Sequence, residues 1–204
     1  PTGSVLSRLK LVVQEPQLLM NSLANLLMSM VLFGAVYTFF PLYASSLSLG
    51  EAAIGSMLAA RALASTFARL PTGLLTAKFS SATIALVALA LAMMGALAIS
   101  STEIALLLGM FLMVDGIAYG VFITASQAAM TEFSSPAERG TAMGVYSTAG
   151  SIGGAVAPFI FGLIADVWGL TAVFRVTGVL VLVGHCLLWY AGLRQRQRAA
   201  MGCS

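Results

Sequence analysis

One acidic side chain lies inside a long apolar stretch of this sequence, where a charge is costly. Asp115 stands within the apolar run from about Ile104 to Ala128. An acid at such a place usually faces a bundle interior or an aqueous cavity, and it is a candidate functional residue by default. At helical spacing the same face also carries Leu108, Phe111, Tyr119, Phe122 and Ser126. A carboxylate beside a tyrosine on such a stripe suits a proton or cation relay, or contact with a cationic substrate.

The same pattern allows a purely structural interpretation of Asp115. A buried aspartate is also satisfied by a neighbouring arginine or by hydroxyl groups, with no part in chemistry. We favour function, because acids are seldom kept inside a membrane without one. The candidates for the path of a substrate or ion are Asp115, Tyr119, Arg61, Phe111, Phe122 and Ser126.

Arg61 is a second charge within an apolar run. Its run and that of Asp115 begin on the same side of the predicted membrane, so depths can be compared at about 1.5 Å per residue. Arg61 then lies about 10 Å beyond Ile54, and Asp115 about 16 Å beyond Ile104. An arginine side chain spans that difference, so we predict an Arg61–Asp115 interaction, direct or through water, if the two helices are neighbours. A pair that merely neutralises itself is an equally open interpretation.

Other polar residues in the apolar runs suggest packing rather than chemistry. Asn21 and Asn25 share a face of the first run, and we expect them to bond across helices as structural glue. His185 and Cys186 are adjacent, so on a helix they diverge by about 100° and cannot form a nucleophile–base dyad. We interpret His185 as a packed or lipid-facing side chain.

The composition decides which solvent surrounds these residues. The chain has 204 residues, of which 59% are hydrophobic and only 8% charged. Soluble domains carry about a quarter charged residues, so most of this chain must lie in lipid. Cys186 and Cys203 provide neither a disulfide framework nor metal-ligand spacing, and we expect no metal and no cofactor. The net charge of +3 is small and gives no argument for nucleic acid.

Six apolar runs are long enough to cross a bilayer, which takes about 20 residues in a helix. Each run is continuous rather than alternating, which indicates helices and not the strands of a barrel. The predicted fold class is an all-α integral membrane protein. We divide the chain into a lead-in (1–17), a bundle (18–193) with spans at about 18–43, 54–75, 82–99, 104–128, 141–164 and 170–193, and a basic tail (194–204).

Basic residues set the predicted orientation, because cytoplasmic loops retain lysine and arginine. One side of the membrane carries Arg8, Lys10, Arg69, Lys78, Arg139, Arg194, Arg196 and Arg198. The opposite loops carry Glu51, Glu103 and Asp166. We therefore expect both ends of the segment in the cytoplasm. Arg175 is the exception, inside the sixth run near its outer end.

Small residues recur along two of the predicted helices. Gly116 and Gly120, beside Asp115, would let another helix approach closely. Pro158 would kink the fifth run or free a carbonyl. That run also carries glycines at spacings suited to tight packing, at Gly144, Gly150, Gly154 and Gly162. Such pliable helices suit a machine whose bundles rock, and they are also ordinary in static membrane bundles.

Several runs together resemble the C-terminal six helices of the major facilitator superfamily (MFS). The segment from Arg61 through Arg69-Leu-Pro-Thr-Gly73 is similar to the helix and loop that carry the second copy of the family's loop motif, of which Gly73 and Lys78 remain. The segment Ser135-Pro-Ala-Glu-Arg-Gly140 and the glycines and proline that follow resemble the family's penultimate span and its flanking loops. The resemblance covers nearly the whole chain.

This resemblance implies two inverted three-helix repeats, with the first and fourth spans lining a central cavity. It implies secondary transport of a small solute by alternating access, often coupled to protons, with export of drugs or metabolites among the options. The expected setting is the plasma (inner) membrane. The expected partner is a missing N-terminal six-helix half. The opening at Pro1 rather than Met suggests a fragment, although processing of a longer chain would give the same opening.

Two other classes of protein were weighed against a transporter. An intramembrane enzyme needs a placed nucleophile and base or a set of metal ligands, and the chain has one histidine and no such motif, so we expect no catalytic residues. A non-transporting or regulatory half-transporter could keep the fold after losing activity, and the degenerate loop motif leaves this open. The retained Asp115 argues against it.

Overall fold

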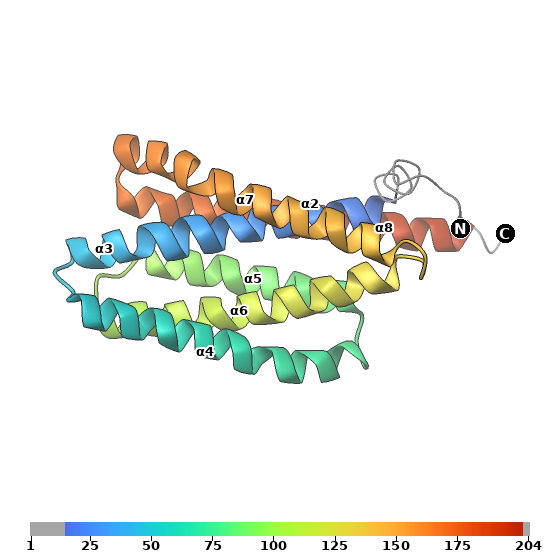
Figure 1. Cartoon of the computed structure of the whole chain (residues 1–204), viewed down its shortest axis with the longest axis horizontal. Coiled ribbons are helices and arrows are strands. Elements are labelled where there is room, and N and C mark those ends of the chain that lie inside the picture. The colour runs from blue at the N-terminus through green and yellow to red at the C-terminus, as the bar shows by residue number, and fades with distance from the viewer. Residues whose placement is uncertain (1–14, 202–204) are drawn as a thin grey trace.

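The computed structural model describes residues 15–201, and the side chains of residues 15–193. Within this part the chain is helical and has no strand. The helices are α2 (Pro16–Met30), η1 (Val31–Phe39), α3 (Phe40–Ser46), α4 (Glu51–Thr76), α5 (Ser81–Ile99), α6 (Ala105–Glu132), α7 (Arg139–Trp168) and α8 (Leu170–Met201). The segments α2, η1 and α3 follow one another without a loop, and together they form the first of the six rods in Figure 1.

Five of these rods are long and apolar enough to cross a membrane: Pro16–Ser46, Ser81–Ile99, Ala105–Glu132, Arg139–Trp168 and Leu170–Leu193. The remaining helix, α4, has 26 residues and therefore sufficient length. It carries Glu51, Arg61 and Arg69, and it is not among the five. The all-helical membrane class is confirmed, whereas the predicted sixth span is not established by apolarity.

The first rod contains a widened, π-helical stretch, η1. Within it the Thr38 hydroxyl donates to the Phe33 carbonyl at 2.7 Å, five residues back. The amide of Phe40 likewise bonds to Ala35, again five residues back. Pro41 provides a physical reason, because its ring has no N–H and crowds the carbonyl four residues earlier. Such wide turns occur often at functional sites.

The helices pack in two pairs on the face shown in Figure 1 and in a second layer behind it. On this face α4 packs along α6, and α7 packs along α2 and η1. Helix α5 packs on α6 and α8, and α8 packs in turn on α2. The short link between α7 and α8 is Gly169, whose φ of 81° favours glycine because no Cβ is present to clash.

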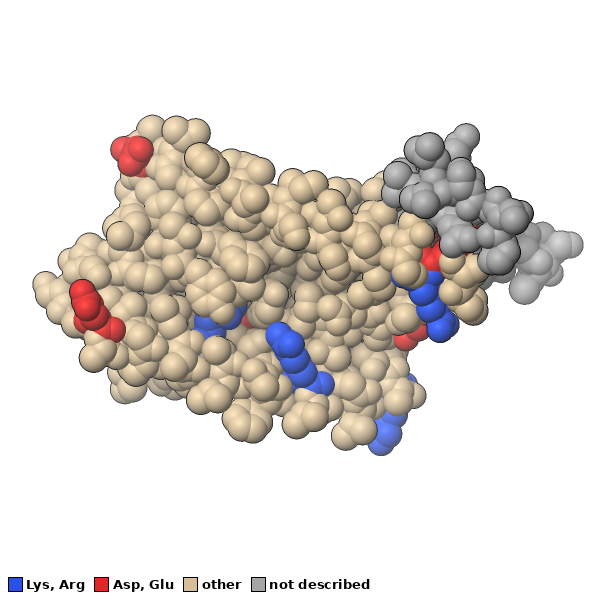
Figure 2. Space-filling model, viewed as in Figure 1, with Lys and Arg blue, Asp and Glu red and all other residues tan. Residues whose placement is uncertain are grey.

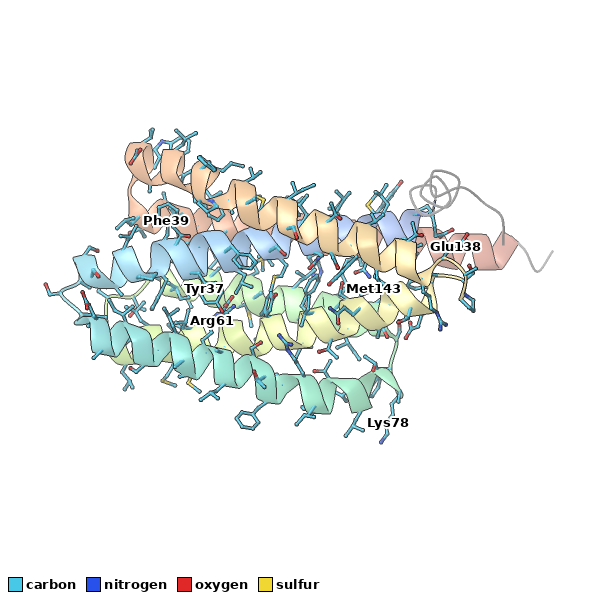
Figure 3. The ribbon with its side chains drawn as sticks, viewed as in Figure 1. Tyr37, Phe39, Arg61, Lys78, Glu138 and Met143 are labelled. Atoms are coloured by element: carbon cyan, nitrogen blue, oxygen red, sulfur yellow. The ribbon has the colours of Figure 1, made fainter. Side chains whose placement is uncertain are left out.

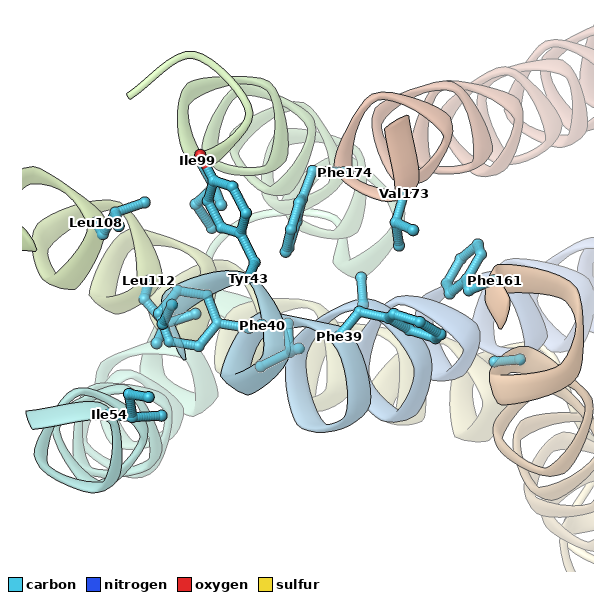
Figure 4. Packing of buried hydrophobic residues seen from close by; sticks show 14 of the residues in the cluster. Phe39, Phe40, Tyr43, Ile54, Ile99, Leu108, Leu112, Phe161, Val173 and Phe174 are labelled. Atoms are coloured by element: carbon cyan, nitrogen blue, oxygen red, sulfur yellow. The ribbon is translucent and has the colours of Figure 1, made fainter. Parts of the chain in front are cut away.

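The end of the first rod forms the centre of the apolar core at one end of the bundle (Figure 4). Phe39 meets Phe161 of α7 edge to face, with ring centroids 6.4 Å apart. Tyr43 packs on Phe174 of α8 at 5.4 Å, and its hydroxyl donates to the Thr102 carbonyl at 3.0 Å. One short helical segment thus ties together helices that are distant in sequence.

The helix bounds differ from the predicted spans mainly at the two ends of the chain. The predicted lead-in ends at 17, but helix α2 already begins at Pro16, and residues 1–14, with Arg8 and Lys10, lie outside the described part. Helix α8 continues to Met201, beyond its apolar part Leu170–Leu193, so the helix runs past the predicted boundary at 193 between the membrane span and the tail. The charged residues after the apolar run do not end the helix, because they form the same backbone hydrogen bonds as apolar residues and arginine and glutamine favour helices.

Candidate functional site

The centre of the candidate site is a direct ion pair between Arg61 of α4 and Asp115 of α6. The Nε and Nη2 atoms of Arg61 both lie 2.8 Å from Oδ2 of Asp115. Each side chain is only 2% exposed. The predicted Arg61–Asp115 contact is therefore confirmed, and it is direct. Since the guanidinium neutralises the carboxylate, the alternative that Asp115 faces a cationic substrate alone finds no support in this arrangement.

Helix bounds and glycines explain why the two charges meet. Arg61 lies ten residues after Glu51, and Asp115 ten residues after Ala105, so each is about 15 Å into its helix and near mid-membrane depth. A Cβ on Gly116 would collide with the Arg61 carbonyl. The same holds for Gly120 and the carbonyl of Ser65. The predicted close approach at these two glycines is confirmed, and it brings the α4 and α6 backbones into contact.

Two tyrosine rings enclose the guanidinium of Arg61. Its Cζ lies 5.5 Å from the ring centroid of Tyr119 and 5.8 Å from that of Tyr37. Figure 3 shows Tyr37 of η1 and Arg61 next to one another between their helices. Both rings are within the range of a cation–π attraction, which is stronger away from water. The pair is thus held by one carboxylate and two aromatic faces.

A cavity of about 450 Å³ lies beside this cluster. It lies between the first rod, α6 and α7, and Tyr119 belongs to its wall. The rest of the lining is amide, hydroxyl, aromatic or small, and it consists of Asn25, Ser29, Phe33, Ile123, Gln127, Tyr146, Ser147, Gly150, Ser151, Gly154 and Ala155. None of the described residues that line it is charged. Volume and lining are those of a site for a small organic solute.

The structure divides the predicted aromatic stripe of α6. Asp115 and Tyr119 lie at the ion pair, and Tyr119 reaches the cavity. Phe111 packs partly buried against the apolar core near Tyr43. Phe122 is fully buried in a second apolar cluster, and the Ser126 hydroxyl donates to Asn21 Oδ1 at 2.7 Å. Neither Phe122 nor Ser126 is among the residues that line the cavity. Neighbouring helices cover part of this face of α6, and both residues lie in the covered part.

A second polar group, the amide cluster, is formed by Asn21, Asn25, Ser126 and Tyr146. Asn21 Nδ2 donates to the Ser126 carbonyl at 2.8 Å, and Asn25 Nδ2 donates to the Tyr146 carbonyl at 2.9 Å. These bonds join α2 to α6 and α7. The prediction that both asparagines bond across helices is confirmed. His185 is packed as well, with Nδ1 3.2 Å from the Leu86 carbonyl.

The predicted packing glycines of α7 have different surroundings. A Cβ on Gly150 would lie 2.7 Å from Asn25 Nδ2, and one on Gly154 would lie 2.7 Å from the Phe33 ring. A Cβ on Gly162 would lie 4.0 Å from the Phe39 ring, and Pro158 lies inside the helix without ending it. Gly144 faces open space within the described part of the chain, so its predicted packing contact is not made there.

The degenerate loop motif lies at the end of α4. Gly73 is exposed, and an added Cβ there would meet nothing within 4 Å in the described structure. Lys78 is exposed in the turn before α5. Neither residue reaches the ion pair or lines the cavity. Any role of Gly73 and Lys78 in a conformational latch stays a prediction.

Sequence reasoning missed two aromatic residues of the first rod. Tyr37 covers Arg61, and Phe33 lines the cavity. Their rings are 6.0 Å apart and each residue is 46% exposed. An aromatic pair four residues apart in a span without charge was the available signal. The direction in which the two rings point depends on the π-helical turn of η1, which helical periodicity in the sequence does not show.

Comparison with known proteins supports the same architecture. The family model described as Major Facilitator Superfamily matches residues 22–200. The chain belongs to this superfamily. Members of this superfamily are membrane transporters, and the suspected resemblance is confirmed. A comparison with curated proteins finds no match. The candidate site therefore rests on the geometry of this chain.

Proposed function

We propose that this MFS chain forms one half of a secondary active transporter that moves a small solute by alternating access. The observation that carries the proposal is the buried Arg61–Asp115 pair beside a cavity of about 450 Å³. Charges at this depth are costly unless they serve a pathway. The cavity lies between the first rod, α6 and α7, and supports the expectation that the first and fourth spans line the route.

The proposal includes α4 as a sixth span and two inverted three-helix repeats. Helix α4 runs parallel to α6 in Figure 1, and its two intramembrane charges are the reason for its low apolarity. If the first three rods are superposed on the last three, the first rod corresponds to α6, α4 to α7 and α5 to α8. The closely packed pair α4–α6 then corresponds to the closely packed pair α7–α2. The contacts of α5 with α6 and of α8 with α2 exchange in the same way. This pairing supports inverted repeats.

Proton coupling is assigned to Asp115 in this proposal. Protonation of Asp115 would cancel its attraction for Arg61 and leave the guanidinium to its two tyrosines and to a ligand. Deprotonation would restore the pair. A transporter needs such a differential interaction to shift between its two open states. Phe111, Phe122 and Ser126 then belong to the packing that surrounds the route, and Tyr119 to the route itself.

A second six-helix half completes the transporter in this proposal. The cavity is open to one side, and α4 leaves many large apolar side chains uncovered, among them Phe67, Leu70 and Leu74. Lipid and another half together would cover them. We place the protein in the plasma (inner) membrane with both ends of the segment cytoplasmic. Lys78 and Arg139 are exposed, and Figure 3 labels Lys78 at the same end of the bundle as Glu138, the neighbour of Arg139. Basic side chains lie at this end and towards the middle of the face in Figure 2, and two acidic side chains lie at the opposite end. Export of drugs or metabolites is included in the proposed activity.

The test is solute flux driven by a pH gradient in liposomes that contain the full-length transporter. A panel of small radiolabelled neutral, anionic and cationic solutes replaces the unknown substrate. We expect gradient-driven flux of at least one solute with the wild type and its loss with Asp115→Asn. Absence of flux for every solute, with folded protein, would instead favour the non-transporting or regulatory half. Equal flux with Asp115→Asn would remove the proposed coupling.

A further inference from the structure

A second arginine of α4, Arg69, is exposed and has no partner among the described residues. The ion pair between Arg61 and Asp115 is the only one there, and Arg69 makes no hydrogen bond within that part. The chain has seven acidic residues, and all seven lie in the described part: Glu15, Glu51, Glu103, Asp115, Glu132, Glu138 and Asp166. None of these acidic side chains therefore pairs with Arg69 in the described structure.

The position of Arg69 around α4 separates it from the apolar face of the helix. At 100° per residue it lies within about 60° of Ala62, Thr66 and Gly73, which are small or polar. The face with the largest exposed apolar side chains is centred elsewhere, about 100° to 200° away, at Phe67, Leu70 and Leu74. Lipid is expected on the apolar face. Arg69 is thus on the flank that adjoins Arg61 and Ser65.

Arg69 also lies level with the cavity wall on α6. Gly116 of α6 is in close contact with Arg61, and Gly120 with Ser65, so the same spacing along the two helices puts Arg69, four residues after Ser65, level with Thr124. Ile123, one residue before Thr124, lines the cavity. Tyr119 lines the cavity and stacks on Arg61. Since Asp115 cancels Arg61, the charge that remains on this side of the cavity is the single positive charge of Arg69. The Ser65 hydroxyl, one turn before Arg69, is buried without a hydrogen-bond partner in the described structure.

We infer that the solute carried by this site is a small organic anion whose charged group binds Arg69. This inference rests on the proposed transport function. An unpaired cation near the inner end of a membrane span is stabilised by a counter-ion, and an anionic solute provides one that leaves with each transport cycle. The aromatic side chains of Phe33 and Tyr119 in the cavity wall fit a planar, apolar body for that solute. A guanidinium is well matched to a carboxylate, because it donates two parallel hydrogen bonds.

A competing explanation for Arg69 is contact with lipid headgroups. Arg69 lies seven residues before Thr76, the last residue of α4, and a long basic side chain near a helix end can extend to the interface. In that case anionic lipid, not solute, would bind it. The small and polar flank favours the solute, and the experiment distinguishes the two.

The experiment measures binding of three probes of nearly equal shape to the full-length transporter. Benzoate is anionic, benzamide neutral and benzamidine cationic. We expect benzoate to bind at least about tenfold more tightly than the other two, and Arg69→Gln to weaken it about tenfold or more. Arg69→Lys should keep part of the affinity, since lysine retains the positive charge but lacks the two parallel N–H donors of the guanidinium. Arg175→Gln, an exposed arginine of α8, is the matched control and should bind benzoate like the wild type.

Three results would overturn the inference. One is wild-type benzoate affinity in Arg69→Gln, and another is a preference for benzamide or benzamidine, or no benzoate binding, in the folded wild type. The third comes from nanodiscs of phosphatidylcholine with and without phosphatidylglycerol: an Arg69→Gln effect on the lipid dependence of thermal stability alone would assign Arg69 to lipid. If any of these results occurs while a neutral or cationic solute still shows Asp115-dependent flux, the inference about an anion fails but the proposed transport function is retained.

Discussion

The two polar clusters of this bundle use different chemistry at comparable burial. The charged cluster, formed by Arg61, Asp115, Tyr37 and Tyr119, joins α4, α6 and η1 through an ion pair and aromatic faces. The amide cluster joins α2, α6 and α7 through neutral hydrogen bonds. The hydrogen bonds of the amide cluster join groups that carry no charge, whereas the ion pair of the charged cluster joins two opposite charges. This difference fits the switch that we propose for the first cluster and a packing role for the second.

The largest effect is expected when one partner of the ion pair is removed. Arg61→Gln leaves Asp115 buried without its counter-charge, which should cost about 3–5 kcal/mol of stability. The double variant Arg61→Gln/Asp115→Asn should recover much of that loss while gradient-driven flux stays absent. A double-mutant cycle of unfolding free energies in detergent measures the coupling. Additive effects would show that the pair is not coupled, and flux in the double variant would show that it is not a switch.

Separating α4 from α6 should have the next largest effect. Gly120→Ala places a methyl group against the Ser65 carbonyl, and overpacking of this kind costs about 1–3 kcal/mol. The matched control is Gly144→Ala, where an added Cβ meets nothing within 4 Å. Thermal denaturation followed by size-exclusion chromatography compares the two. Equal losses in both variants would mean that the charged cluster does not depend on close helix contact.

The amide cluster should show a smaller effect and of a different kind. Asn21→Ala removes the bonds to Ser126, and polar bonds between membrane helices are worth about 0.6 kcal/mol on average. Stability should fall slightly in Asn21→Ala, and flux should remain. The measurement is flux per folded molecule. Loss of flux in Asn21→Ala without unfolding would place this cluster in the transport path and would abolish the contrast.

The smallest effect is expected at the rim of the charged cluster. Tyr37 is half-exposed, so its cation–π contribution should be about 0.5–1 kcal/mol. Tyr37→Phe keeps the ring face and should leave the stability of the Arg61–Asp115 pair unchanged, whereas Tyr37→Leu should lower it. Double-mutant cycles with Arg61→Gln isolate this term. A loss in Tyr37→Phe equal to that in Tyr37→Leu would assign the effect to the hydroxyl instead of the ring.

The order of apolar runs determined most of the fold by itself. Bilayer thickness sets helix length, and lipid cannot bond to exposed backbone, so long apolar runs have only the helix available. The ion pair also followed from sequence, because depth along a helix is proportional to residue number and Arg61 and Asp115 are equally deep. The glycines beside Asp115 indicated the close approach that lets them meet.

What tertiary structure alone decided is which side of each helix faces which neighbour. Helical spacing put Phe111, Asp115, Tyr119, Phe122 and Ser126 on one face, but helix packing buried Phe122 and Ser126 and left Tyr119 at the cavity. Sequence could not show that η1 turns Tyr37 toward Arg61, nor that Tyr119 is at the cavity wall. The physical reason is that burying an apolar side chain against lipid and burying it against protein are about equally favourable. Hydropathy therefore identifies a span, and only packing identifies its partners.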